Sequence, residues 1–151
     1  MKVTSLSNKE IIEYLEITPP FLMIDIAEEV LPGKSSHAVK ELKKDEWFFK
    51  CHLEKEKIMP GALQIEAMLQ TLVLTIYTMD GHKGKLALVT DIKTKLISKV
   101  SPGSKLDIYA DLISYKRGVS KGIVECKVDN SKVCQGEFTL LSPHDMPLPR
   151  K

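Results

Sequence analysis

The sequence predicts an α+β domain in which a curved antiparallel sheet wraps one long apolar helix. Residues 62–79 would carry apolar side chains on nearly every side of a helix, so other elements must enclose it. Strand-like runs precede and follow this segment, and neither kind of element can hide its apolar surface alone. With 151 residues, 43% apolar and 28% charged, the chain is predicted to be one domain, residues 1–151, with its own apolar core.

The N-terminal residues predict a short helix over about 8–15. Ser7 and Glu10 have the S-x-x-E spacing of a capping box, in which two side chains satisfy free backbone N–H groups at the helix start. Leu6 and Ile11 occupy the two positions of a hydrophobic staple. Two successive prolines follow and prevent the helix from continuing.

A β-hairpin and an aromatic segment are predicted next. Residues 21–26 predict a strand, Pro32-Gly33 a turn, and residues 36–42 the partner strand. The aromatic residues 47–49 predict a short strand or a docked loop whose role is packing.

The long helix, predicted over about residues 61–79, is expected inside the protein. The apolar region around it, residues 58–79, approaches the length that crosses a bilayer. Gln64, Glu66 and Gln70 interrupt this region within two turns, so a helix buried in protein is the better prediction and no membrane insertion is expected.

The rest of the chain predicts an antiparallel meander and a tail. Four strand-like runs are separated by turns containing Gly, Pro, Asn or Ser. Residues 143–151 hold three prolines and predict an extended, partly disordered tail. The four predicted strands cover about 86–100, 105–115, 120–129 and 132–141.

Composition and charge exclude several classes of function. Lys and Arg number 22 against 20 Asp and Glu, and the aromatic content is 6%, so a nucleic-acid partner is not expected. The cysteines, Cys51, Cys126 and Cys134, form no C-x-x-C pair, which argues against a disulfide framework and favours a reduced, cytoplasmic location. The charged N-terminus lacks the apolar stretch of a signal peptide.

The sequence indicates no metal site and no cofactor. His37, His82 and His144 are scattered along the chain without the spacing of metal ligands. Residues 81–85 lack the G-x-x-x-x-G-K-[ST] spacing of a phosphate-binding loop.

Glu66 is the first candidate for chemistry. An ionised carboxylate in an apolar helix is costly to bury, so Glu66 needs a partner, an exit to solvent or a bound proton. A purely structural pairing remains an alternative. His52 lies 14 positions earlier, and a histidine paired with a carboxylate in an apolar site can supply base and acid near neutral pH. The free N–H groups of the helix start at Gly61 can hold a carbonyl oxygen that gains negative charge. Together these groups suit proton abstraction next to a carbonyl.

Two stretches carry a family resemblance. FKCHL at residues 49–53, followed by IMPGALQIEAMLQ at 58–70, resembles the active-site region of the (3R)-hydroxyacyl-[acyl carrier protein] dehydratases of fatty-acid synthesis, the FabZ-like hotdog proteins. PFLMID at 20–25 is similar to the family's P-F-L-x-x-D, and VSPG at 100–103 to its V-x-P-G turn. The resemblance implies a hotdog fold, in which the sheet wraps the long helix.

The resemblance also implies a role for each matching residue. His52 matches the catalytic histidine, Glu66 the catalytic acid, and Gly61 the glycine whose backbone N–H polarises the thioester carbonyl. The family needs no cofactor and no metal. The residues implied at the substrate tunnel or its gate are Pro60, Ala62 and Leu53.

The implied partners are an acyl carrier protein with a phosphopantetheine-linked acyl chain and further copies of this chain. In the family, the histidine and the acid of one site come from different subunits of a homodimer, often assembled into a trimer of dimers. Basic residues offer a docking patch for an acidic carrier, with a generic solvated sheet face as the alternative. These residues are Lys95, Lys99, Lys105, Lys116, Arg117 and Lys121.

The chain departs from the family around His52. The family usually has G-H-F-P-G-x-P there, whereas this chain has CHLEKEK at residues 51–57, and ITPP at 17–20 replaces the family's H-R-Y-P. A specialised paralogue acting on an unusual acyl chain would account for these changes. Two alternatives are a hotdog thioesterase and a catalytically silent carrier-binding subunit. The I-M-P-G-x-L-x-x-E-A-M-x-Q pattern favours dehydration.

Overall fold

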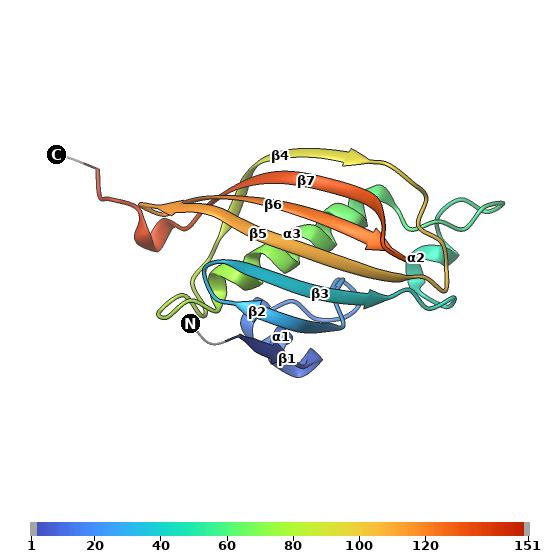
Figure 1. Cartoon of the computed structure of the whole chain (residues 1–151), viewed down its shortest axis with the longest axis horizontal. Helices are drawn as coiled ribbons and strands as arrows, with labels where there is room; N and C mark the ends of the chain where they lie inside the picture. Colours follow the sequence, from blue (N-terminus) through green and yellow to red (C-terminus); the bar gives the residue numbers. More distant parts are fainter. Residues whose placement is uncertain (1–2, 150–151) are drawn as a thin grey trace.

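The computed structural model describes residues 3–149, which form a seven-stranded antiparallel sheet around a long helix (Figure 1). The strand order is β1-β2-β3-β5-β6-β7-β4, and this arrangement confirms the α+β prediction. The strands are β1 (Thr4–Leu6), β2 (Ile26–Leu31), β3 (Ser35–Glu41), β4 (Leu88–Leu96), β5 (Lys105–Lys116), β6 (Val119–Val128) and β7 (Ser131–Leu141). The helices are α1 (Asn8–Leu15), α2 (Trp47–Lys50), α3 (Gly61–Tyr77) and the 3₁₀ helix η1 (Pro143–Asp145).

Helix α3 forms the centre of the core, as predicted. It packs against the inner face of β5, β3 and β6 and against α1. Met68, Leu72 and Leu74 are fully buried and join strand residues such as Ile108 in one apolar cluster. The helix ends at Tyr77, two residues before its predicted end. Within residues 3–149, no helix has the length and apolar character needed to span a membrane.

Helix α1 begins with the predicted capping box. The backbone N–H of Glu10 donates to Ser7 Oγ at 3.3 Å, and the N–H of Ser7 donates to Glu10 Oε1 at 3.2 Å. Leu6 and Ile11, the predicted staple, are both buried. The hydrogen bonds that define the helix start therefore come from residues adjacent in the sequence.

The sequence predicts a strand over residues 21–26, but residues 21–25 form an irregular segment and β2 begins only at Ile26. The apolar side chains at 22–24 are buried, which explains the pattern that predicts a strand. The backbone N–H of Met23 donates at 2.7 Å to the side-chain oxygen of Gln70 on α3, so its partner is not a neighbouring strand. A short apolar run indicates burial but does not specify the hydrogen-bond partner.

The aromatic residues 47–49 belong to the short helix α2, which corrects the prediction of a strand or loop. The N–H of Phe49 donates to the carbonyl of Glu46 at 3.1 Å and closes a helical turn. Phe48 and Phe49 are buried, so their predicted packing role is confirmed.

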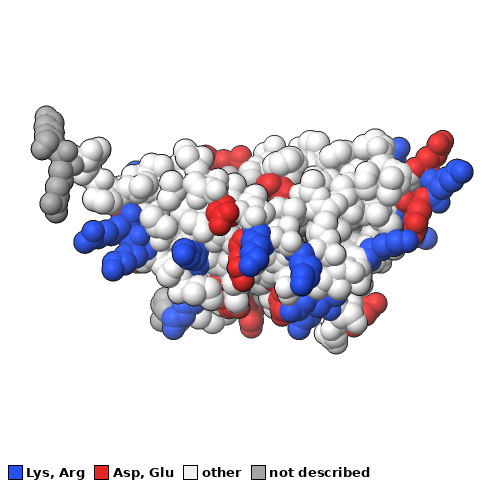
Figure 2. Space-filling model, turned by 90° about the horizontal axis from the view of Figure 1, so that it is seen from above, with Lys and Arg blue, Asp and Glu red and all other residues white. Residues whose placement is uncertain are grey.

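Strand β4 lies at the edge of the sheet, beside β7. Strands β5, β6 and β7 pair in succession, as a meander requires, but β4 pairs with β7 and β5 pairs with β3. The meander prediction is therefore wrong for β4, because turn residues mark where strands end but not which strands become neighbours. Figure 2 looks down on this edge and shows a wide uncharged region, with charged side chains gathered to one side and at the ends.

The C-terminal segment is more ordered than predicted. Residues 143–145 form η1 instead of an extended tail, and they dock beside the loop that follows α3. Asp145 Oδ2 accepts a hydrogen bond from Tyr115 OH at 2.7 Å and lies 3.1 Å from His82 Nε2. Residues 146–149 form no helix or strand, and the last two residues of the predicted tail lie outside the described part of the chain.

Candidate active site

His52 lies in the loop between α2 and α3, where it is half-buried. Its Nδ1 lies 3.2 Å from the carbonyl oxygen of Ile58. Because a carbonyl can only accept, the hydrogen-bond network assigns the proton to Nδ1 in the neutral ring. The Nε2 lone pair is then available to take a proton from a substrate.

The loop after His52 is exposed and turns sharply. Leu53 is 52% exposed and adopts a left-handed backbone conformation with φ of 48°. Residues 54–57 are also exposed, and Glu56 Oε1 pairs with Lys99 Nζ at 2.6 Å. The charged residues that replace the family's usual loop are therefore solvated, and they leave the His52–Ile58 contact in place.

The start of α3 presents free backbone donors. The Pro60 carbonyl accepts from the N–H groups of Leu63 at 3.0 Å and Gln64 at 3.1 Å, whereas the N–H groups of Gly61 and Ala62 have no acceptor within residues 3–149. These two N–H groups lie at the positive end of the helix dipole. They are suited to hold an oxygen that gains negative charge.

Gly61 packs closely against strand β4. A Cβ atom at this position would overlap the side chain of Leu96 on that strand. Just before the helix, the N–H of Met59 donates to the Val100 carbonyl at 2.8 Å. The helix start is thus held against the last residues of β4 and the chain that follows them.

The Glu66 side chain has a hydrogen-bond partner and also reaches an open cavity. Its Oε1 accepts a hydrogen bond from Gln70 Nε2 at 3.0 Å, and the side chain is half-buried. It also lines an open cavity of ≈ 170 Å³. The other residues around this cavity are mainly apolar: Leu15, Ile17, Leu69, Val73, Tyr77, Ala87, Val89 and Leu140, together with Gln70.

Gln70 is the residue whose role the sequence leaves undecided. Its amide group bonds the carboxylate of Glu66 and the carbonyl of Phe21, and its oxygen accepts from the N–H of Met23. Gln70 therefore joins α3 to the irregular segment before β2 while it orients Glu66. The spacing of four residues on one helix, which places two side chains side by side, was the available signal.

In the described part of one chain, His52 and Glu66 have separate partners. Among the described residues, no hydrogen bond joins them, and His52 is absent from the lining of the cavity at Glu66. Glu66 lies five positions after Gly61 on the helix, which corresponds to about 7.5 Å along the axis and a rotation of about 140°. The tunnel candidates Pro60, Ala62 and Leu53 lie at the His52 end and also do not line that cavity.

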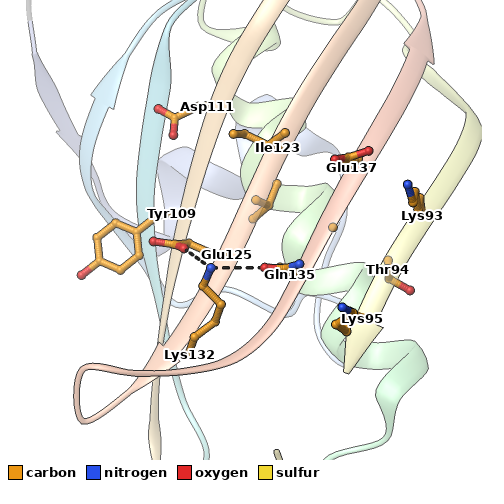
Figure 3. Close-up of a pocket in the computed structure, with 12 residues that line it drawn as sticks. Lys93, Thr94, Lys95, Tyr109, Asp111, Ile123, Glu125, Lys132, Gln135 and Glu137 are labelled. Atoms are coloured by element: carbon orange, nitrogen blue, oxygen red, sulfur yellow. Dashed lines mark hydrogen bonds and ion pairs between the residues drawn. The ribbon is translucent and has the colours of Figure 1, made fainter. Parts of the chain in front are cut away.

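A shallow cavity of ≈ 510 Å³ lies on the outer face of the sheet, across β4 to β7 (Figure 3). It contains none of the predicted catalytic residues, although Lys95 of the predicted basic patch lines it. Lys132 Nζ pairs there with Glu125 at 3.0 Å and bonds Gln135 at 3.2 Å. Charges of both signs alternate over this face, as is typical of a solvated sheet surface.

Comparison with known proteins gives the family. The model of the FabA-like domain matches residues 17–137, which include His52, Gly61 and Glu66. The chain belongs to the FabA-like family. It is 38% identical over 134 residues to the 3-hydroxyacyl-[acyl-carrier-protein] dehydratase FabZ of Ruminiclostridium cellulolyticum, covering 88% of this chain and 94% of that protein. The FabZ of Clostridium novyi is 37% identical over 135 residues, covering 89% of this chain and 95% of its own length.

Solved structures confirm the hotdog fold of this FabA-like chain. The dehydratase heterocomplex ApeI:P from Xenorhabdus doucetiae has a TM-score of 0.69 at 17% identity, covering 88% of this chain and 90% of its own. An uncharacterized protein from Pyrococcus horikoshii has a TM-score of 0.69 at 12% identity, covering 86% and 90%. At such low identity, these similarities establish the fold alone.

Proposed function

We propose that the chain dehydrates (3R)-3-hydroxyacyl-[acyl carrier protein] thioesters to trans-2-enoyl thioesters in fatty-acid or specialised lipid biosynthesis. The observation that carries the proposal is the position of His52, whose Nδ1 is held by the Ile58 carbonyl just before a helix start with free N–H groups. The FabZ relatives, which match almost the whole chain, support the same reaction.

The chemistry follows from three groups. His52 Nε2 removes a proton from C2 of the acyl chain, while the Gly61 N–H stabilises the negative charge that develops on the thioester oxygen. Glu66 directs or protonates the departing C3 hydroxyl. A C–H bond and a C–O bond break, a C2–C3 double bond forms, and water leaves, so the reaction needs no external oxidant or reductant.

The site is shared between two copies of the chain, which pair along β4. Leu88, Val89, Ile92 and Leu96 on this edge strand are between 41% and 50% exposed. A nine-residue edge strand with this much exposed apolar surface is an aggregation risk unless another strand covers it. A second β4, paired antiparallel, would provide that cover and give an isologous dimer.

Antiparallel pairing of β4 also supports the composite site. Gly61 packs against Leu96, the last residue of β4, whereas the cavity at Glu66 includes Val89, near the first. Two β4 strands paired about the central residue, Ile92, place the first residues of one strand beside the last residues of the other. The His52 end of one chain then lies beside the Glu66 cavity of its partner, which would complete two active sites per dimer.

The experiment is incubation of the purified protein with carrier-bound 3-hydroxyacyl thioesters of different chain length, followed by mass spectrometry. Loss of one water is expected for at least one length. His52→Ala and Glu66→Gln should lower the rate by roughly 10²–10⁴-fold. His37→Ala is the control, because this histidine stacks on Tyr109 at 4.2 Å and pairs with Asp107, outside the proposed site.

Three outcomes would contradict the assignment. Release of free carrier thiol would identify a thioesterase, and absence of any product would identify a silent carrier-binding subunit. Undiminished turnover in either active-site variant would refute the assigned roles. Light scattering on the same samples distinguishes a dimer from a trimer of dimers.

A further inference from the structure

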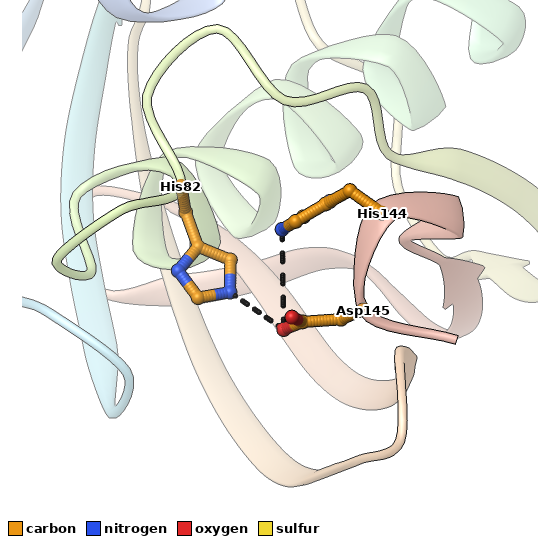
Figure 4. A group of neighbouring side chains, drawn as sticks. All are labelled: His82, His144 and Asp145. Atoms are coloured by element: carbon orange, nitrogen blue, oxygen red, sulfur yellow. Dashed lines mark hydrogen bonds and ion pairs between the residues drawn. The ribbon is translucent and has the colours of Figure 1, made fainter. Parts of the chain in front are cut away.

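Two histidines and an aspartate meet at the end of the molecule where α3 terminates (Figure 4), and the hydroxyl of Tyr115 lies beside them. His82 comes from the loop after α3, Tyr115 from the end of β5, and His144 and Asp145 from η1. His82 and His144 lie 62 positions apart in the sequence, but tertiary folding brings them together. None of these residues belongs to the candidate active site.

The ligand atoms converge within a space suited to one metal ion. His82 Nε2, His144 Nε2 and an Asp145 carboxylate oxygen all lie within 4.8 Å of one another. His82 Nε2 is 3.1 Å and His144 Nε2 is 3.9 Å from Asp145 Oδ2. Bond lengths of about 2.0–2.2 Å to zinc place tetrahedral ligand atoms about 3.3 Å apart, so only small side-chain movements separate this cluster from a metal site.

The surrounding contacts orient the cluster. His82 Nδ1 lies 3.0 Å from the Asp80 carbonyl, which leaves Nε2 directed at the cluster. A histidine ligand usually donates its other N–H to such an acceptor, which fixes the ring orientation. Ser142, just before η1, donates its N–H to the Gly118 carbonyl at 2.7 Å and thereby fastens η1 to the turn between β5 and β6.

Tyr115 lies beside the three proposed ligands. Its hydroxyl lies 3.1 Å from His82 Nε2 and donates to Asp145 Oδ2 at 2.7 Å. A water molecule or this hydroxyl would complete four-coordination around an ion held by two imidazoles and one carboxylate. Imidazole nitrogen selects borderline ions of the zinc, nickel and cobalt type over magnesium or calcium.

We propose that His82, His144 and Asp145 form a binding site for one transition-metal ion of the zinc class, which fastens the C-terminal segment to the loop after α3. The site joins three segments of the chain, and therefore the bound ion stabilises the folded state relative to the unfolded one. It is independent of the proposed dehydration.

The test is titration of untagged, chelator-treated full-length protein with Co²⁺, followed by displacement with Zn²⁺. The parent protein carries Cys51→Ser, because the exposed Cys51 thiol is itself a potential ligand. We expect one Co²⁺ per chain, with ligand-field absorption bands and no thiolate charge-transfer band. Zn²⁺ at about 100 times its dissociation constant should raise the melting temperature by roughly 8 °C.

The variants His82→Ala and His144→Ala should each weaken metal binding roughly tenfold or more and abolish the thermal shift. His37→Ala is the matched control, since this histidine also pairs with a carboxylate, Asp107, but lies on β3. His144 has only a 3.9 Å contact with Asp145, so His144→Ala keeps the test valid if His82→Ala unfolds. Equal binding by parent and His144→Ala, or no binding by the parent, would overturn the proposal.

Discussion

Mixed dimers of two inactive variants provide the sharpest test of the shared active site. In His52→Ala the base is lost, and in Glu66→Gln the acid is lost, so each homodimer should retain only about 10⁻²–10⁻⁴ of the wild-type rate. In the proposed β4-paired dimer, opposite ends of the two α3 helices would meet, so in a mixed dimer the intact His52 of one chain would face the intact Glu66 of the other. One of the two sites is then complete.

The expected recovery follows from the symmetry. Equal amounts of the two chains assemble at random into about half mixed dimers, each with one working site, so the pool should reach about one quarter of wild-type activity. The variants would be co-expressed, native mass spectrometry would confirm the mixed dimer, and enoyl product would be measured with a carrier-bound 3-hydroxyacyl substrate.

A matched control separates complementation from simple stabilisation. When His52→Ala is co-expressed with the double variant His52→Ala/Glu66→Gln, no chain carries His52. Activity should therefore stay at the level of the single variant. If the first mixture also stays at that level although mixed dimers form, His52 and Glu66 do not act across the β4 interface. The composite-site model would then be wrong.

Three further predictions concern the edge strand, the helix cap and the orientation of Glu66. Ile92→Lys should convert the dimer to a monomer, as measured by analytical ultracentrifugation, and should abolish activity. The control is Ile113→Lys, at an exposed apolar position on β5, which should change neither the oligomeric state nor the activity. If Ile92→Lys remained a dimer, the β4 interface would be excluded. Ser7→Ala should lower the free energy of unfolding by about 1 kcal/mol in urea titrations at neutral pH. Hydrogen bonds from the Ser7 side chain and backbone lower the pKa of the Glu10 carboxyl. The stabilisation by the ionised Glu10 is therefore complete above the usual pKa of Glu and is lost as pH falls through the lowered pKa. A destabilisation by Ser7→Ala that did not change with pH would contradict this reasoning. Gln70→Leu should lower the free energy of unfolding by about 1–3 kcal/mol, because the Met23 N–H loses its buried acceptor. The same variant should lower turnover, because Glu66 loses the hydrogen bond that orients it. Unchanged stability and turnover would refute both roles of Gln70.

Local sequence signals predicted much of the fold. The capping box at Ser7 and Glu10 predicted α1 to the residue, since its hydrogen bonds form within one turn. The apolar surface of residues 61–79 predicted that α3 must be enclosed, because exposing so much apolar surface to water is unfavourable. The strand predictions failed at residues 21–25, where the Met23 N–H donates to a side chain on α3, and at residues 47–49, which form a tight helical turn.

The family and the candidate catalytic residues could also be predicted from the sequence, because the I-M-P-G block and the spacing from His52 to Glu66 are local features of the chain. Tertiary structure decided what depends on contacts between distant segments. It placed β4 at an exposed edge, separated His52 from the cavity of Glu66 within one chain, and brought His82 to His144 and Asp145. Spacing along a chain specifies distance only within one helix or strand, whereas sheet pairing and loop packing set every longer distance.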